Sequence, residues 1–314
     1  MVMQLDADIR AYLESVASSP RPSDNPAGIE AMRQATHLAW SSGPGPDRAA
    51  LVKDYFATGH GVQVPLRLYR PPAAEGPLPL ILFMHGGGFV FGSVDTHNDI
   101  GHRLATEAGS AVLSVDYRLA PEHPFPAAVQ DSWTALNWAL TNAERIGIDP
   151  DRIVVHGDSA GGNLAAVTAL QARDAGISLA GQALIYPVTD LREVEYESRL
   201  TRAEGFGLTS EDMRWYGGNY LGDPARADDP LASPMLAADL AGLPATFLMT
   251  SGFDPLCSEG QAYGERLRQA GVAVEHLHLP GANHGVYSNW RTFRSGEAVW
   301  QLLLAWLQPV LKVS

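Results

Sequence analysis

The stretch 152–163, which reads RIVVHGDSAGGN, constrains the fold more than any other part of this 314-residue chain. The apolar run 153–155 predicts a buried strand, and the alanine-rich run 164–172 predicts a helix. Between them, Gly157 and Gly161 flank Ser159 at a spacing of two. A turn this tight strains the serine backbone and needs residues nearly free of side chain at both flanking positions. Strand, Gly-x-Ser-x-Gly and helix together predict a nucleophile at a sheet edge.

The turn alone is a weak signal, because a chain with 31 glycines contains such spacings by chance. A glycine-rich turn with a capping serine is the alternative interpretation. The surrounding pattern must therefore decide between them. Strands are predicted at 51–57, 62–69, 78–84, 111–115, 153–156, 179–186, 245–250 and 272–279. Helices are predicted at 96–108, 127–145, 164–175, 258–270 and 297–311. The first two strands form a hairpin, and the later alternation predicts an α/β fold with about eight mostly parallel strands and helices on both faces.

Two regions stand outside this alternation and predict a helical cap. Within residues 1–50, apolar residues recur at helical spacing at Leu5, Ile9, Leu13 and Val16. A second helix is expected from Asn25, with Pro26 at its first position, to Trp40. Residues 191–240 are rich in charged, aromatic and glycine residues, and an insertion of this length is more typical of a lid than of a disordered loop. The core is then expected in two parts, 51–190 and 241–314.

The composition of the chain restricts the binding partners and the cellular location that we expect. The net charge of −13 repels phosphate backbones and anionic membranes, so a nucleic-acid partner is not expected. No apolar stretch approaches the ~18 residues that span a bilayer, and the start MVMQLDADIR does not resemble a secretory signal, so we expect a cytoplasmic protein without stable membrane insertion. The single cysteine, Cys257, excludes an internal disulfide. It is interpreted as a small buried apolar residue rather than a catalytic thiol.

A serine nucleophile needs a general base and an orienting carboxylate. His284 follows the last predicted strand, and chemistry in such sheets gathers where strands end. Asp254 follows the preceding strand and is favoured as the acid, although an Asx turn before Pro255 is its structural alternative. Asp190 is the competing acid. The order Ser159, Asp254, His284 is the α/β-hydrolase order of a catalytic triad.

The run His85-Gly86-Gly87-Gly88-Phe89 follows a predicted strand. Successive glycines let backbone N–H groups approach a reacting carbonyl, as an oxyanion hole requires. A plain turn or a phosphate loop is the alternative, and the phosphate loop is disfavoured because no Lys-Ser or Lys-Thr follows. His85 is expected to brace this loop by hydrogen bonding rather than to act as the base.

These motifs resemble one family. HGGGF at 85–89, DYRLAPEHPFPAA at 116–128, GDSAGGN at 157–163, DPL at 254–256 and HG at 284–285 are similar to the bacterial hormone-sensitive-lipase-like, or family IV, carboxylesterases of the α/β-hydrolase fold. The resemblance covers residues 50–310. It implies the triad Ser159, His284, Asp254, oxyanion donors from the N–H groups of Gly87, Gly88 and Ala160, and a cap from the N-terminus and the insertion.

Two positions depart from the family pattern. Ser258 stands where the family often has a second acid, in DPLxDEG, and Asn283 stands where an apolar residue often precedes the histidine. Neither departure removes a triad group, but both leave the hydrogen bonding of the acid loop open.

The sequence therefore predicts a serine carboxylic-ester hydrolase for short- to medium-chain acyl esters, acting through an acyl-enzyme without metal or organic cofactor. Activity should decline as pH falls through the pKa of the histidine base, about 6.5 when unperturbed. The expected pocket residues are Phe89, Phe91, Phe206, Leu208, Trp215, Leu256 and Tyr287. A non-catalytic ligand receptor on the same fold and an amidase are the competing interpretations. The last strand, at a sheet edge, could pair two subunits as a homodimer.

Overall fold

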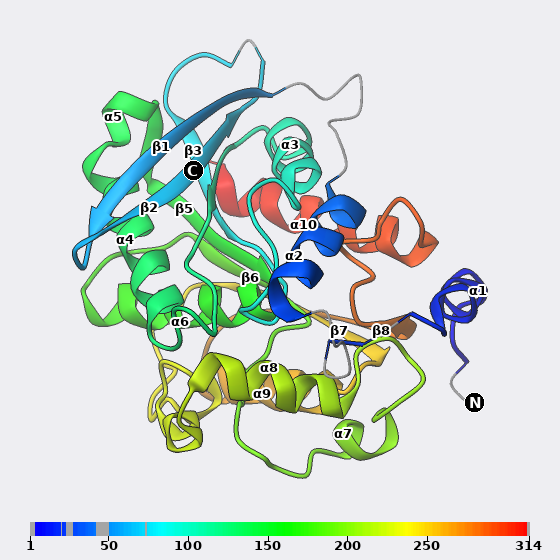
Figure 1. Ribbon diagram of the computed structural model, residues 1–314. Helices are drawn as coiled ribbons and strands as arrows, with labels where there is room; N and C mark the ends of the chain where they lie inside the picture. The colour runs from blue at the N-terminus through cyan, green and yellow to red at the C-terminus, as the bar shows by residue number, and fades with distance from the viewer. Residues whose placement is uncertain (1–3, 20, 23–27, 42–49, 73, 313–314) are drawn as a thin grey trace.

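A computed structural model describes residues 4–19, 21–22, 28–41, 50–72 and 74–312. Its centre is an eight-stranded sheet in the order β1-β2-β4-β3-β5-β6-β7-β8 (Figure 1). The strands are β1 Leu51–Gly59, β2 Val62–Arg70, β3 Leu78–Met84, β4 Ala111–Val115, β5 Ile148–Asp158, β6 Gly181–Ile185, β7 Thr246–Phe253 and β8 Val274–Asn283. Strands β1, β2 and β4 pair antiparallel, and every pairing from β4 across to β8 is parallel. The predicted mostly parallel sheet is confirmed.

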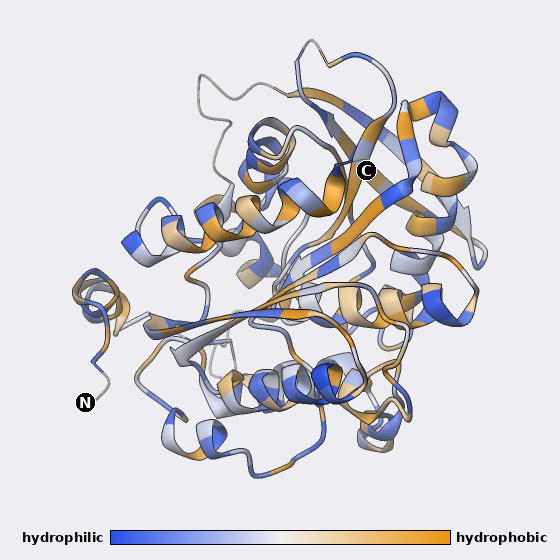
Figure 2. Cartoon of the chain, turned by 180° about the vertical axis from the view of Figure 1, so that it is seen from behind, coloured by the Kyte–Doolittle hydropathy of each residue, from blue (hydrophilic) through white to orange (hydrophobic). Residues whose placement is uncertain are grey.

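Helices cover both faces of the sheet. The core helices are α3 Asn98–Glu107, α4 Ala127–Thr141, α5 Ala143–Ile146, α6 Ala160–Asp174, α9 Cys257–Gln269 and α10 Arg294–Leu311. One apolar cluster joins α4, α6 and α9 to one face, and a second joins α3 and α10 to the other. In Figure 2, α10 carries alternating orange and blue bands, as expected of a helix with a single apolar face.

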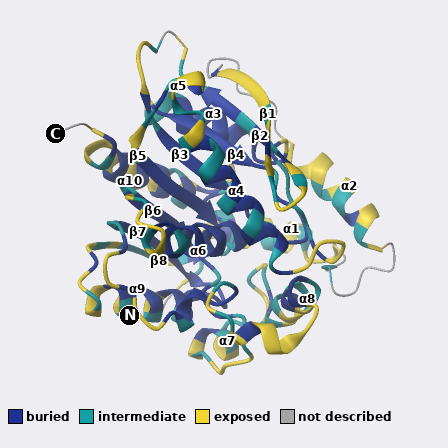
Figure 3. Cartoon of the chain, turned by 90° about the vertical axis from the view of Figure 1, so that its left-hand side faces the viewer, coloured by how far each residue is buried: buried dark blue, intermediate teal, exposed yellow. Residues whose placement is uncertain are grey.

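Burial follows position in the sheet. Every residue of β4, β6 and β7 is buried, which explains why their sequences are nearly continuous apolar runs. Strand β1 lies at the edge and exposes most of its residues (Figure 3). Among the described residues, no helix combines the length and the apolar character needed to cross a bilayer.

The elements outside the alternation are short helices. At the N-terminus, α1 spans Ala7–Val16 and α2 spans Gly28–Trp40, so the expected end of α2 is confirmed. Its expected start, at Asn25 and Pro26, lies outside the described residues. Between β6 and β7 lie α7 Glu197–Thr201, α8 Ser210–Leu221 and the 3-10 turns η2 Pro224–Asp228 and η3 Pro234–Leu236. Helix α8 begins with a capping box, because Thr209 and Asp212 bond each other's backbone N–H.

One predicted helix is wrong in its continuity. The single helix expected over 127–145 is divided into α4 and α5, because Asn142 leaves the helical conformation at φ −106° and ψ 15°. The side chain of Asn142 donates to the carbonyl of Trp138, an interaction that competes with the helical backbone.

The core contains a neutral histidine that makes stability depend on pH. The ring of His156 is fully buried, and its nitrogens lie 2.9 Å from the Ala183 carbonyl and 2.8 Å from the Tyr287 hydroxyl. Burial lowers the pKa of His156 to about 4.

In the unfolded chain a histidine titrates near 6.5. Between about pH 6.5 and pH 4 the unfolded state therefore binds a proton that the folded state does not. Stability is full above this window and falls as pH drops through it, by up to about 3 kcal/mol for His156. Thermal unfolding between pH 8 and pH 4 should show this fall, and the fall should be smaller in His156→Gln. The exposed control His123→Gln should keep the wild-type slope. An unchanged slope in His156→Gln would contradict the assignment.

Candidate active site

The turn between β5 and α6 places Ser159 in a strained backbone. Its φ is +56° and its ψ is −119°, a conformation that L-residues avoid. The two flanking glycines have no room for side chains. A Cβ on Gly157 would lie 2.2 Å from the Gly161 carbonyl oxygen, and a Cβ on Gly161 would lie 2.0 Å from the Met84 carbonyl oxygen. This geometry favours the predicted nucleophile turn over an ordinary glycine-rich helix start, and Ser159 makes no side-chain capping bond.

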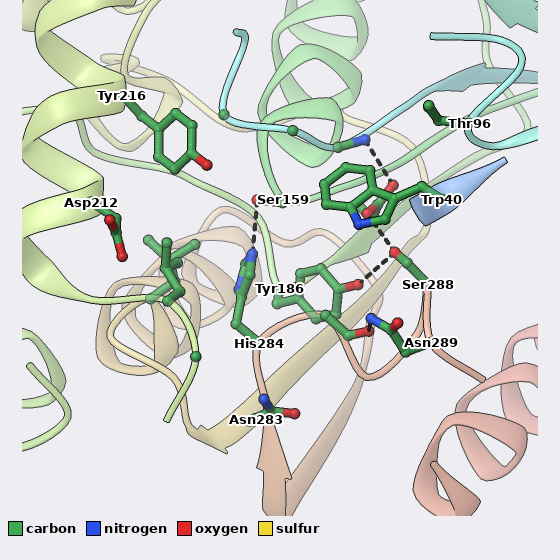
Figure 4. A pocket seen from close by; sticks show the side chains of 18 of the residues that line it. Trp40, Thr96, Ser159, Tyr186, Asp212, Tyr216, Asn283, His284, Ser288 and Asn289 are labelled. Atoms are coloured by element: carbon green, nitrogen blue, oxygen red, sulfur yellow. Dashed lines mark hydrogen bonds between the residues drawn. The ribbon is translucent and has the colours of Figure 1, made fainter. Parts of the chain in front are cut away.

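The three predicted side chains meet at the carboxyl ends of their strands. His284 Nε2 lies 2.9 Å from Ser159 Oγ, and His284 Nδ1 lies 2.8 Å from Asp254 Oδ2 (Figure 4). Asp254 is fully buried, and its other oxygen accepts the Leu256 N–H at 2.9 Å. The ring of Tyr186 packs against the imidazole with 4.5 Å between centroids. Serine, imidazole and carboxylate therefore form a continuous hydrogen-bonded chain across 125 residues of sequence.

The competing candidates lie elsewhere. Asp190 forms an ion pair with Arg192 at 2.9 Å and accepts from Tyr196. Cys257 is buried, and burial raises the pKa of its thiol to about 12, so it is not a thiolate nucleophile. Neither residue contacts His284 through a hydrogen bond in the described part of the chain.

The glycine run 86–88 forms a close-packed loop beside Ser159. Gly87 and Gly88 have φ of +125° and +61°, and a Cβ on Gly88 would lie 2.2 Å from the ring of Tyr216. Among the described residues, neither the Gly87 N–H nor the Gly88 N–H has an acceptor. Ala160 is the first residue of α6, whose opening N–H groups lack intrahelical partners. Gly87, Gly88 and Ser159 line the same cavity, and Ala160 directly follows Ser159 in the chain.

His85 bonds within this loop. Its Nδ1 lies 2.8 Å from the Gly86 carbonyl oxygen, and its ring stacks on Tyr117 at 4.3 Å and on His97 at 5.2 Å. Burial lowers the pKa of His85 to about 3, so the ring is neutral near pH 7. This contact is the bracing hydrogen bond expected from the sequence.

Ser258 and Asn283, the two residues that depart from the family pattern, both form hydrogen bonds. The Ser258 hydroxyl accepts the Ser198 N–H at 3.1 Å, and the Ser198 hydroxyl accepts the Ser258 N–H at 2.9 Å, which ties α7 to α9. The Asn283 side chain donates to the Phe206 carbonyl at 3.1 Å. The hydrogen bonding that the sequence left open therefore links the loops carrying Asp254 and His284 to the segment 191–240.

A cavity of about 530 Å³ opens onto Ser159 and His284. Of the predicted pocket residues, Phe89, Leu208 and Leu256 line it. Helices α1 and α2 contribute Tyr12, Leu13, Val16 and Trp40, and α8 contributes Asp212, Met213, Tyr216 and Gly217. In Figure 4, Tyr216 and Asp212 lie on one side of Ser159, and Trp40, Thr96 and Ser288 lie on the other.

Four predicted pocket residues do not line this cavity. Phe91 and Trp215 stack on each other, 6.1 Å between centroids, and Phe206 packs on Phe253. Tyr287 is fully buried, where its hydroxyl bonds His156 and its ring stacks on Trp300 at 4.6 Å. Placing Tyr287 in the pocket was therefore wrong, because its side chain points into the core from the loop that carries His284.

Tyr186 and Tyr216 line the cavity but were not among the predicted pocket residues. Tyr216 follows Trp215 directly, and adjacent residues on a helix point about 100° apart, so one of the pair faces the cavity and the other packs behind it. The aromatic pair was visible in the sequence, but the rotation of α8 was not. Tyr186 directly follows β6 and has φ of +33°. The sequence pattern around it did not predict this backbone conformation.

Comparisons with known proteins agree with this geometry. A family model described as alpha/beta hydrolase fold matches residues 81–288. The carboxylic ester hydrolase LipN of Mycobacterium tuberculosis is 42% identical over 252 residues, which cover 77% of this chain and 66% of LipN. An ethyl acetate hydrolase of Pseudomonas putida is 36% identical over 293 residues, covering 90% of this chain and 92% of that protein.

Among solved structures, an esterase of Pyrobaculum calidifontis matches with a TM-score of 0.89 at 36% identity, covering 97% of this chain and 98% of the esterase. The family match extends over most of the sheet and includes Ser159 and His284. The chain therefore belongs to the hormone-sensitive-lipase-like, or family IV, carboxylesterases of the α/β-hydrolase fold.

Proposed function

We propose that this protein hydrolyses carboxylic esters through an acyl-enzyme on Ser159. The observation that carries the proposal is the hydrogen-bonded chain from Ser159 Oγ through His284 to Asp254, at 2.9 and 2.8 Å, beside the free amides of the loop 86–88. A hydroxyl in this position can lose its proton to the imidazole, and a carbonyl oxygen can lie against the amides. A non-catalytic receptor has no need of this geometry.

In the proposed first step, His284 Nε2 takes the proton of Ser159 as Oγ attacks the ester carbonyl. The carbonyl oxygen gains a negative charge, which the N–H groups of Gly87, Gly88 and Ala160 stabilise. Asp254 keeps the imidazole in the tautomer with its proton on Nδ1 and stabilises the imidazolium that forms. Each well-placed amide donor is worth about 2.7–4 kcal/mol in such a transition state.

In the second half, His284 gives its proton to the alcohol oxygen, and the C–O bond breaks to leave the acyl group on Ser159. Water then takes the place of the alcohol. His284 removes a proton from this water as its oxygen attacks the acyl carbonyl. Collapse of the second tetrahedral species releases the carboxylic acid and returns the proton to Ser159.

We propose further that α1, α2 and the segment 191–240 form a cap that sets the length of the acyl group. Support comes from the cavity wall, where Leu13, Met213 and Leu208 contribute apolar side chains from these segments. A cavity of about 530 Å³ lies within the usual range for small-molecule sites. It suits short- to medium-chain acyl esters better than long ones.

A series of p-nitrophenyl esters from C2 to C12 tests this proposal. We expect kcat/KM to be highest among the short and medium chains and to fall toward C12. Leu208→Trp, which narrows the cavity, should move the limit to shorter chains. The control Leu200→Trp lies on α7 with 62% of its surface exposed and should leave the limit unchanged. A preference for C12 in the wild type would contradict the proposed size limit, and absence of any ester hydrolysis would contradict the function itself.

The homodimer remains a proposal supported by topology. Strand β8 is the last strand of the sheet, the position at which a second copy pairs in a dimer of this kind, although the Gly281 carbonyl near its end already accepts the Asp6 N–H at 2.9 Å. Light scattering on the purified protein measures the mass directly, and a mass of one chain at all concentrations would exclude it. The cytoplasmic location and the lack of a nucleic-acid partner remain predictions from composition.

A further inference from the structure

Two consecutive peptide units lead to the amides beside Ser159, and side chains hold both of them. In the unit between His85 and Gly86, the carbonyl oxygen accepts from the Tyr117 hydroxyl at 2.7 Å. The N–H of the same unit donates to Asp158 Oδ1 at 3.0 Å. Because a peptide unit is planar and its C=O and N–H point in opposite directions within the plane, these two bonds fix its rotation.

The next unit, between Gly86 and Gly87, is held on one side only. Its carbonyl oxygen accepts from His85 Nδ1 at 2.8 Å, and since a carbonyl can only accept, Nδ1 carries the proton. The N–H of this unit belongs to Gly87 and points opposite to the carbonyl. Three of the four polar groups in the two units are therefore bonded to side chains, and the fourth is a proposed oxyanion donor.

Asp158 also reaches the loop that carries the histidine. Its second oxygen, Oδ2, accepts from the Ser288 hydroxyl at 2.9 Å. Ser288 lies four residues beyond His284 and is 3.2 Å from the hydroxyl of Tyr186, whose ring packs on the imidazole. In Figure 4 a dashed line joins the hydroxyls of Ser288 and Tyr186. Asp158 directly precedes Ser159 in the chain, and its carboxylate bonds both the glycine loop and the loop that carries His284.

Asp158 packs tightly against the Gly86 backbone. Asp158 is 3% exposed, and a Cβ added to Gly86 would lie 2.5 Å from Asp158 Oδ2. Within the mechanism above, Asp158 transfers no proton and bonds no substrate atom. Its bonds fix backbone and hydroxyl groups whose positions decide where the oxyanion amides and the imidazole lie.

We propose that Asp158 and Tyr117 are positioning residues for the reaction. Together they orient the peptide unit that leads to the Gly87 N–H. Through its bond to Ser288, Asp158 also holds the loop that carries His284 in place relative to that peptide unit. The inference rests on the proposed esterase function. It predicts that loss of either residue weakens transition-state binding more than substrate binding.

The test compares Tyr117→Phe, Asp158→Asn and Asp158→Ala in the full chain, with rates expressed per active site titrated by a fluorophosphonate. Tyr117→Phe should lower kcat about 10-fold and Asp158→Ala about 100-fold, below or at the low end of the loss caused by removing an oxyanion donor outright. KM should stay within about twofold, because ground-state binding is not affected. Asp158→Asn keeps an oxygen for the Gly86 N–H and a donor for Ser288, so its kcat should lie between the wild type and Asp158→Ala.

Two further readouts separate positioning from stability. The inhibition constant of a trifluoromethyl ketone, which forms a charged tetrahedral adduct, should rise by the same factor as kcat/KM falls. The matched control Tyr263→Phe removes a buried hydroxyl that has no partner among the described residues, so kcat and inhibition should be unchanged.

The inference is overturned if Tyr117→Phe keeps the wild-type kcat, or if Asp158→Asn falls to the level of Asp158→Ala. It is also overturned if kcat falls while the inhibition constant does not change. If Asp158→Ala does not fold, the kcat values of Tyr117→Phe and Asp158→Asn still test the proposed positioning role. A wild-type protein that hydrolyses no ester would instead contradict the proposed function.

Discussion

Ser159→Ala should lower kcat for p-nitrophenyl butyrate by about 10⁵- to 10⁶-fold, because it removes the hydroxyl that forms the acyl-enzyme. The alternative thiol, Cys257, is buried, and its raised pKa keeps it protonated. Removing one hydroxyl should leave the cavity and its substrate affinity intact, so binding of the ester measured by calorimetry should be unchanged. Release of p-nitrophenol gives the rate.

The control for this variant is Ser132→Ala. Ser132 is fully buried, whereas Ser159 is only partly buried, and the Ser132 hydroxyl bonds the Ala128 carbonyl inside α4, away from the cavity. We expect wild-type kcat from it. If Ser159→Ala kept more than about one hundredth of the wild-type rate, Ser159 would not be the nucleophile.

Asp254→Asn should lower kcat by about 10⁴-fold while the fold is retained. The carboxylate accepts the proton of His284 Nδ1 at 2.8 Å and so leaves Nε2 free to accept the serine proton. An amide nitrogen in the same place favours the opposite tautomer, in which Nε2 carries the proton and cannot act as a base. Stopped-flow measurement of the first turnover should show that acylation is slowed.

Asp190→Asn is the matched control, since Asp190 is the carboxylate that competed with Asp254 in the sequence. It is fully buried but pairs with Arg192 and Tyr196. Its loss should lower the melting temperature and leave kcat per active site within a few-fold of wild type. A larger loss of kcat in Asp190→Asn than in Asp254→Asn would reverse the assignment of the acid.

The parts of the site that could be predicted are those in which chemistry restricts the residue type. Gly157 and Gly161 are required because a Cβ would collide with backbone 2.0–2.2 Å away, and the glycines at 87 and 88 are required by positive φ and close contacts. Because such steric constraints allow only glycine at these positions, they can be recognised in a single sequence. The order of strands followed because alternating apolar runs and helices allow few topologies.

The pocket was harder to predict because apolar side chains serve core and cavity equally well. Phe89 and Phe91 are two residues apart in the same glycine-rich loop, yet Phe89 lines the cavity while Phe91 packs on Trp215. Tyr287 was misplaced for the same reason. The hydrogen bonds of the Asp158 carboxylate could not be predicted for a different reason. Its partners Gly86 and Ser288 are 72 and 130 residues away in the sequence.

The break in the helix over 127–145 shows a third limit. Asn142 has modest helix propensity, and one such residue within a long amphipathic run seldom ends a helix. Here α5 ends at its C-cap Gly147, which is left-handed, and β5 then runs beside β3, where Leu78 pairs with Ile148. Tertiary packing therefore overrode local preference.

The most direct test of Ser159 as the nucleophile is the mass of the protein after reaction with diethyl p-nitrophenyl phosphate. This reagent transfers its diethylphosphoryl group to an activated serine, releases p-nitrophenolate, and leaves a stable adduct. We expect one adduct per chain, located by peptide mapping on Ser159, and no adduct in Ser159→Ala. Labelling at another residue instead of Ser159 would contradict Ser159 as the nucleophile.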